Sequence, residues 1–146
     1  MKKLCILFFF SFILCNIISA QWSVGGRFGG TSGVTVKHYP ASAGLLFEGI
    51  AAYNFDDHLD AFSVTLLLEK LGALNSQGTL GAIIGGGETM VFGDEFYLGI
   101  NGILGFDWRI GRIGVQVDWM PTYIFINDSY FSPINLAFTA RWVFQR

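Results

Sequence analysis

The sequence is poor in cysteine, in proline and in charged side chains. Its 146 residues include two cysteines and three prolines, and Asp, Glu, Lys and Arg together make up 14% of the chain. Both cysteines, Cys5 and Cys15, lie within the first 20 residues. If that segment is removed, no thiol is left, so we expect a mature protein without disulfides.

The segment 1–20 has the pattern of a secretory signal peptide. Two lysines precede an apolar run from Leu4 to Leu14, and the small residue Ala20 ends the segment. We expect cleavage before Gln21 and a mature chain of residues 21–146. An uncleaved helical anchor is an alternative at the lower limit of spanning length. A lipoprotein acylated at Cys15 is another, although large side chains precede that cysteine.

Positive charge is scarce in the expected mature chain. The whole sequence has nine Lys and Arg against eleven Asp and Glu, and the signal segment contains two of the lysines. Seven basic and eleven acidic residues remain, a net charge of −4. Without a basic patch, nucleic acid is not an expected partner.

Helical periodicity of useful length is also missing after residue 20. Short alternating or apolar runs, separated by Gly, Asn and Asp, are typical of an all-β protein. They predict eight strands, at residues 22–31, 33–39, 44–53, 59–71, 79–87, 96–110, 113–121 and 135–144. The faces of the fifth strand cannot be assigned because it has so little polarity. Most of the strands are near the roughly 9 to 11 residues that a tilted strand needs to cross a bilayer.

Alternation along these strands separates apolar side chains from charged ones. One face carries aromatic and branched residues, for example Trp108, Phe138 and Trp142. The opposite face carries four basic and four acidic residues, namely Arg27, Lys37, Glu48, Glu69, Asp107, Arg109, Asp118 and Arg141. Charges that share a confined interior must pair, and the two signs are equally represented here.

This division predicts an eight-stranded antiparallel up-and-down transmembrane β-barrel. A charge facing lipid costs about 2 to 4 kcal/mol at the midplane, which explains the apolar face, while the interior of such a barrel is polar. Eight strands enclose a space that side chains fill, so we expect a packed polar interior without an aqueous channel. Many of the 19 glycines lie inside strands, where they leave room for long interior side chains and for sharp bending.

Aromatic residues near the strand ends predict girdles at the two membrane interfaces. They are Trp22, Tyr39, Tyr53, Tyr97, Trp119, Tyr123, Trp142 and Phe144. The alternative interpretation is that they are ordinary aromatic core residues.

The connections fit an up-and-down barrel only in part. The sixth, around Gly111 and Arg112, is tight, and the fifth ("ETMVFGDE") and seventh ("TYIFINDSYFS") are long. The fourth connection ("GALNSQG") is longer, and the first ("TSG") shorter, than short periplasmic turns and long outer loops would require. The segment "YIFI" of the seventh connection is expected to extend the strands beyond the membrane.

Several segments together resemble the small outer-membrane β-barrel proteins of Bacteroidetes-type bacteria. They are "VGGRFGGTSGVTVKHY", "FEGI", "LLLEK", "YLGINGILGFDWRI", "VQVDWMP" and "LAFTARWVF". The chain is also similar to the eight-stranded group that includes the OmpA barrel and OmpX-like proteins. The resemblance implies an outer-membrane location and insertion by the barrel-assembly machinery, which reads a last strand with alternating aromatics. Leu136, Phe138, Trp142 and Phe144 fit that signal, and Gln145–Arg146 depart from it.

Candidates for chemistry are few. Some eight-stranded barrels modify lipid A with a His and a Ser or acidic partner. Here His38 and His58 are the two histidines, with Ser32, Ser42, Ser63 and Asp57 as conceivable partners. The cluster Asp56, Asp57, His58 and Asp60 resembles a cation site, but irregularly spaced carboxylates are more often a solvated loop. We expect no catalytic residue, no metal site and no cofactor.

The sequence thus predicts a non-enzymatic outer-membrane barrel with a structural or adhesion role. Its expected partners are outer-membrane lipid, the assembly machinery and an extracellular ligand or protein at the outer loops. Those loops carry aromatic and acidic residues, which favour a contact surface. Two alternatives remain, a lipid A-modifying enzyme and a soluble, lipocalin-like secreted barrel that binds an apolar ligand. The second requires Trp108 and Phe138 inside the barrel, with Arg109 and Arg141 outside.

Overall fold

A computed structural model describes residues 21–40, 44–56, 59–127 and 129–144 of the chain. Its strands are β1 (Gln21–Gly29), β2 (Gly33–Tyr39), β3 (Leu45–Asp56), β4 (Leu59–Ala73), β5 (Leu80–Phe92), β6 (Phe96–Ile110), β7 (Ile113–Trp119), β8 (Thr122–Ile126), β9 (Tyr130–Ser132) and β10 (Leu136–Phe144). The expected signal peptide lies outside the described residues. None of the described segments is a helix long and apolar enough to cross a membrane.

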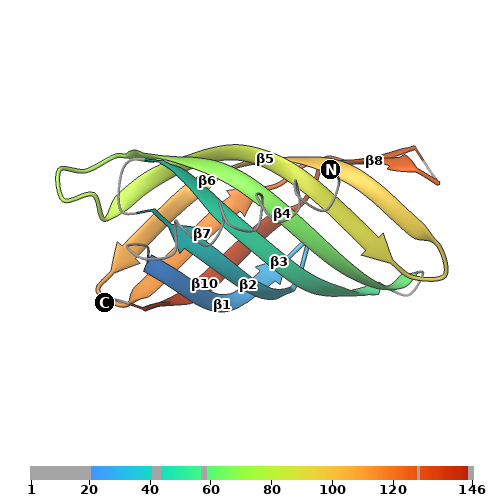
Figure 1. The fold of residues 1–146 in the computed structure, drawn as a ribbon, viewed down its shortest axis with the longest axis horizontal. Coiled ribbons are helices and arrows are strands. Elements are labelled where there is room, and N and C mark those ends of the chain that lie inside the picture. The colour runs from blue at the N-terminus through green and yellow to red at the C-terminus, as the bar shows by residue number, and fades with distance from the viewer. Residues whose placement is uncertain (1–20, 41–43, 57–58, 128, 145–146) are drawn as a thin grey trace, which may run out of the picture.

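The strands form a closed antiparallel barrel (Figure 1). Neighbours pair in the order β1, β2, β3, β4, β5, β6, β7 and β10, and β10 pairs with β1 to close the barrel. The all-β fold and the eight-stranded barrel predicted from the sequence are therefore confirmed. We call the end that carries Gln21 and Phe144 the base, and the opposite end, toward the β8–β9 hairpin, the mouth.

The seventh strand of the barrel is interrupted once. β7 pairs with Leu104–Ile110 of β6, and β8 pairs with residues 98–101 of the same strand. Pro121 lies between them, and its ring nitrogen has no hydrogen to donate to the ladder. Its carbonyl still accepts a hydrogen bond from the N–H of Gly102 at 3.1 Å. β8 therefore continues along β6 toward the mouth.

The β8–β9 hairpin lengthens the wall at the mouth, where it projects at the end of the barrel in Figure 1. This agrees with the expectation that "YIFI" extends the strands. The fifth connection was predicted to be long, and that prediction is wrong. β5 continues to Phe92 and β6 begins at Phe96, so a turn of residues 93–95 joins them. The residues before the turn pair with β6 as strand instead of forming a loop.

Alternation along each strand gives the barrel two different faces. The nine residues of β10 alternate strictly between exposed and buried, beginning and ending with exposed Leu136 and Phe144. On β5, whose faces the sequence could not assign, Ile83 is buried while Ile84 is 62% exposed. Large apolar residues thus cover the outside, and the buried face of each strand turns into the barrel.

Inward-facing glycines allow the strands to curve around so narrow an interior. A Cβ atom added at Gly25 would collide with the backbone oxygen of Ala140, and one added at Gly105 with the backbone oxygen of Val117. At Gly49, which faces outward, the nearest atom would be Leu66 Cδ2 at 3.9 Å. Glycine is thus needed where the backbone of the neighbouring strand leaves no room for a side chain.

Candidate functional sites in the barrel interior

Most of the interior near the base is occupied by charged side chains, which we call the charged layer. It consists of Arg27, Lys37, Glu48, Glu69, Asp107, Gln116, Asp118 and Arg141, all at most 3% exposed. They come from β1, β2, β3, β4, β6, β7 and β10, so nearly every strand of the barrel contributes. The next residue along each strand faces outward, which is why the sequence pattern could identify all of them except the uncharged Gln116.

Lys37 and Arg141 are at the centre of this layer. Lys37 Nζ lies 2.5 Å from Glu69 Oε2, 3.3 Å from Glu48 Oε2 and 3.6 Å from Asp107 Oδ2. Arg141 Nη2 donates to Glu48 Oε1, and Nη1 lies 3.9 Å from Asp107 Oδ2. Both cations therefore contact Glu48 and Asp107, and the four strands that carry these residues are joined through them.

Gln116 joins the two halves of the layer. Its side-chain oxygen accepts hydrogen bonds from Lys37 Nζ at 2.8 Å and from Arg141 Nη1 at 2.7 Å. Its amide nitrogen donates to Asp118 Oδ2 at 2.8 Å, and Asp118 in turn accepts two hydrogen bonds from Arg27. The sequence analysis did not select Gln116. Its even spacing with Asp118 on one strand is the signal that would have found it.

Arg109 lies outside the charged layer, contrary to expectation. It is only half-buried, its Nη2 donates to the carbonyl of Gly78 at 3.0 Å, and its guanidinium lies 5.1 Å from the centre of the Tyr39 ring. The cause is the position of Arg109 along the barrel axis. β6 reaches the rim of the base at this residue, and there the β4–β5 turn supplies a backbone carbonyl for the guanidinium. Among the described residues the buried charges are thus three cations and four carboxylates, not four of each.

The aromatic residues expected at the interfaces fall into two groups. Six are on the outer surface and half-buried or exposed, namely Trp22, Tyr53, Trp119, Tyr123, Trp142 and Phe144. Two face inward, which contradicts the girdle assignment for them. Tyr39 is 4% exposed and donates from its hydroxyl to Asp107 Oδ2 at 2.8 Å. Tyr97 shares the inward face of β6 with Asn101 and lines a cavity at the mouth.

An apolar layer separates the charged layer from the mouth. It is formed by the buried cluster Ile50, Ala52, Leu67, Ile83, Ile103 and Met120. Along β4 the inward residues run Thr65, Leu67 and Glu69, from the mouth toward the base. The interior is therefore polar, apolar and charged in succession.

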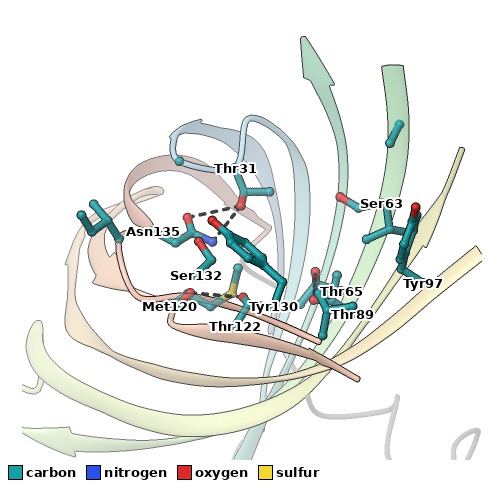
Figure 2. Close-up of a pocket in the computed structure, with 15 residues that line it drawn as sticks. Thr31, Ser63, Thr65, Thr89, Tyr97, Met120, Thr122, Tyr130, Ser132 and Asn135 are labelled. Carbon is teal, nitrogen blue, oxygen red and sulfur yellow. Dashed lines mark hydrogen bonds between the residues drawn. The ribbon is translucent and has the colours of Figure 1, made fainter. Parts of the chain in front are cut away.

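Beyond the apolar layer, hydroxyl and amide groups surround a cavity of about 240 Å³. Thr31, Ser63, Thr65, Thr89, Thr122 and Asn135 are among the residues that line it, and Figure 2 shows their side chains around a common space. The sequence analysis did not predict this mouth cavity. Its described residues are uncharged and lie on five strands and three connections, so no local pattern identifies it.

Residues considered for catalysis are not brought together in the described part of the chain. His38 is at the base, half-buried, with its ring 4.7 Å from that of Trp22. Ser32 follows β1 and Ser63 lines the mouth cavity, both at the opposite end of the barrel. Ser42, Asp57 and His58 lie outside the described residues, and with them two of the four residues of the cation-site candidate.

Comparisons with known proteins give a likeness of shape but no match of sequence. No protein-family model matches the chain, and no curated protein matches it. A solved structure, the crystal structure of Neisserial surface protein A (NspA), aligns over 85% of this chain and 92% of its own, with 10% sequence identity and a TM-score of 0.45. The description of this barrel therefore depends on its own geometry.

Proposed function

We propose that the protein is an integral outer-membrane β-barrel that acts without catalysis, through the surface at its mouth. The observation that carries this proposal is the outer surface of the barrel. Large apolar residues are exposed on every strand of the closed barrel, among them Phe28, Val34, Phe47, Leu68, Ile84, Phe106, Val117 and Phe138. Water does not tolerate so large an apolar patch on a monomer, whereas lipid favours it.

The orientation of the two faces argues against a soluble ligand-binding barrel. Trp108 is 50% exposed and Phe138 is 46% exposed, while Arg141 is 3% exposed. A lipocalin-like barrel requires the opposite arrangement of these side chains. The interior of a lipocalin-like barrel would be apolar, but here seven charged residues fill the interior near the base.

Strand lengths suggest how the barrel is oriented in the bilayer. β3, β4, β5 and β6 contain 12, 15, 13 and 15 residues, and about 9 to 11 tilted residues span the hydrocarbon. These strands therefore extend beyond the bilayer at one end. We place the mouth outside the cell, because the start of β1, the end of β10 and the tight 111–112 turn belong to the base.

The filled interior favours a structural or adhesion role over transport. The charged and apolar layers occupy the barrel between base and mouth, as expected for eight strands. At the mouth, the β8–β9 hairpin exposes Tyr123, Phe125, Tyr130 and Phe131, each at least 41% exposed. Exposed aromatics of this kind suit contact with another molecule.

The last strand is suited to recognition by the barrel-assembly machinery. Leu136, Phe138, Trp142 and Phe144 all face outward on β10. This supports the assembly machinery as a partner, together with outer-membrane lipid. A lipid A-modifying activity has less support, because His38 lies at the base, far from the expected outer leaflet.

The proposal is tested by folding the mature chain, residues 21–146, into detergent and into lipid vesicles. We expect a β-rich circular dichroism spectrum and faster gel migration before boiling in SDS than after it. Protein that stays soluble without detergent, with no heat-dependent shift, would contradict the membrane barrel. An altered lipid A mass spectrum in cells carrying the gene would contradict the non-enzymatic role.

A further inference from the structure

The mouth cavity has the chemistry of a binding site, and the proposed adhesion role does not specify what it holds. It encloses about 240 Å³ inside the outer wall (Figure 2). None of the described side chains that line it is charged. A phosphate, a carboxylate or a metal ion would therefore meet no opposite charge there.

The walls of the cavity are held in place by two sets of hydrogen bonds. Thr65 Oγ1 lies 2.7 Å from Thr89 Oγ1, which is bonded to Asn101, and Asn101 Nδ2 donates to Thr122 Oγ1 at 2.9 Å. On the opposite wall, Asn135 Nδ2 donates to Thr31 Oγ1 at 2.9 Å. Groups fixed in this way present their remaining lone pairs in constant directions.

Other hydroxyl groups face the cavity with no hydrogen bond from the described residues. Ser63 is 4% exposed as a residue, and its hydroxyl faces the cavity without a hydrogen bond to any described residue. Ser132 and Tyr130 also line the cavity, and their side-chain hydroxyls make no hydrogen bond to described residues. A hydroxyl that a ligand shields from water without pairing is costly, so a bound ligand should place its own hydroxyl groups against these side chains.

The cavity also offers flat and apolar surfaces. The rings of Tyr97 and Tyr130 line its sides, and Met120 from the apolar layer closes it toward the charged layer (Figure 2). A ligand that fits must carry hydroxyl groups at its edges and C–H groups on its faces. A neutral sugar ring has both.

We propose that the mouth cavity binds a neutral saccharide residue. In this arrangement Ser63, Ser132 and the two hydrogen-bonded walls contact the hydroxyl groups, while a tyrosine ring covers a C–H face of the sugar. The inference rests on the proposed function only in placing the mouth outside the cell, where such sugars are accessible. The binding chemistry itself depends on the cavity alone.

Binding is tested with the mature protein folded in lipid nanodiscs, because maltoside and glucoside detergents would compete for the cavity. Saturation-transfer NMR is recorded with glucose, galactose, N-acetylglucosamine and maltose as probes. Glucose 6-phosphate and hexan-1-ol serve as anionic and apolar comparisons. We expect at least one neutral sugar to bind and both comparison compounds to bind more weakly.

Matched variants locate the binding to the cavity. Ser63→Ala and Tyr130→Ala should each weaken sugar binding about tenfold, the size expected for losing one buried hydrogen bond or one ring contact. Ser23→Ala alters a buried serine at the base, and Tyr123→Ala alters an exposed tyrosine of the same hairpin that does not line the cavity. Both controls should stay within about twofold of the unchanged protein.

Three results would overturn the inference. They are no binding of any neutral sugar, binding of hexan-1-ol or glucose 6-phosphate at least as strong as that of the sugars, and sugar binding that Ser63→Ala and Tyr130→Ala leave unchanged. The heat-dependent gel shift, measured on the same preparation, reports the membrane barrel separately. A failed sugar titration with an intact shift thus rejects the saccharide site without rejecting the barrel.

Discussion

Arg27 on β1 and Asp118 on β7 form a bidentate ion pair inside the barrel. Strand β10 lies between β1 and β7 in the barrel wall. Nη1 of Arg27 donates to Oδ2 of Asp118 and Nη2 donates to Oδ1, both at 2.7 Å, and neither side chain is exposed. The two residues are 91 positions apart in the sequence. The pair therefore connects strands at the place where the first and last strands close the barrel.

Removing one partner of this pair should destabilise the barrel strongly. Arg27→Leu leaves the buried Asp118 carboxylate with Gln116 as its remaining partner, and breaking a buried pair costs about 3 to 5 kcal/mol. Urea unfolding of the protein folded into vesicles measures the loss. Arg112→Leu, in the exposed 111–112 turn, is the control and should change stability by less than about 0.5 kcal/mol. Equal losses for the two variants would contradict the buried ion pair.

Removing both partners should cost less than removing one. Arg27→Leu combined with Asp118→Leu leaves no uncompensated charge, so the double variant should be more stable than either single variant. The same urea titration gives the coupling free energy. A double variant with the summed losses of the singles would show that the two side chains act independently.

Arg141 and Arg109 should differ in importance although both are basic residues on inward faces. Arg141 contacts Glu48, Gln116 and Asp107, and Arg141→Leu is expected to cost about 3 to 5 kcal/mol. Arg109 is half-buried and donates one side-chain hydrogen bond, to the backbone carbonyl of Gly78, so Arg109→Leu should cost about 1 kcal/mol. Thermal or urea unfolding distinguishes them. A larger loss at Arg109 would mean that the base rim, and not the charged layer, limits stability.

An inward glycine should tolerate a methyl group far less than an outward one. At Gly25 the added Cβ would collide with the backbone of Ala140 and Arg141, so Gly25→Ala should cost about 1 to 3 kcal/mol or more, or prevent folding. At Gly49 the added Cβ has 3.9 Å to Leu66 Cδ2, and Gly49→Ala should be within about 0.5 kcal/mol of neutral. The fraction of protein that shows the heat-dependent gel shift measures folding. Similar folding of the two variants would contradict the close approach of β1 and β10.

Charge on the outer surface should have a cost that depends on depth in the bilayer. Phe106 is 58% exposed near the middle of β6, and Phe106→Arg should cost about 2 to 4 kcal/mol in vesicles. Phe131 is 55% exposed on β9, which we place beyond the bilayer, so Phe131→Arg should cost about 0 to 1 kcal/mol. Unfolding in the same lipid compares them. A barrel surrounded by water would show no penalty for Phe106→Arg.

Alternation alone was enough to predict the barrel and most of the charged part of its interior. Because side chains alternate strictly along a strand, charged residues among apolar neighbours identify the inward face without knowledge of any contact. Seven of the eight charged residues selected this way are buried. Arg109 was misassigned because alternation gives the face of a strand but not the height along the barrel axis.

At the strand ends, the type of a residue predicted its location less well than the face of the strand on which it lies. Tyr39 and Tyr97 were grouped with interfacial aromatics because they lie near strand ends, but both are on inward faces. Tyr39 buries its ring because its hydroxyl reaches Asp107 at 2.8 Å. The fifth connection was mistaken for a long loop because "ETMVF" has no clear alternation of polarity.

The sequence by itself determined the strand number, the two faces of the wall and the need for a charged interior, because all three follow from side-chain alternation within single strands. Tertiary structure decided which charges meet, since Arg27 and Asp118 or Lys37 and Glu69 are brought together only when the barrel closes with a defined stagger between strands. Tertiary structure also decided where the mouth cavity forms and which residues line it. Uncharged residues from distant strands enclose that space only because strands of unequal length share one barrel, and no local pattern records this.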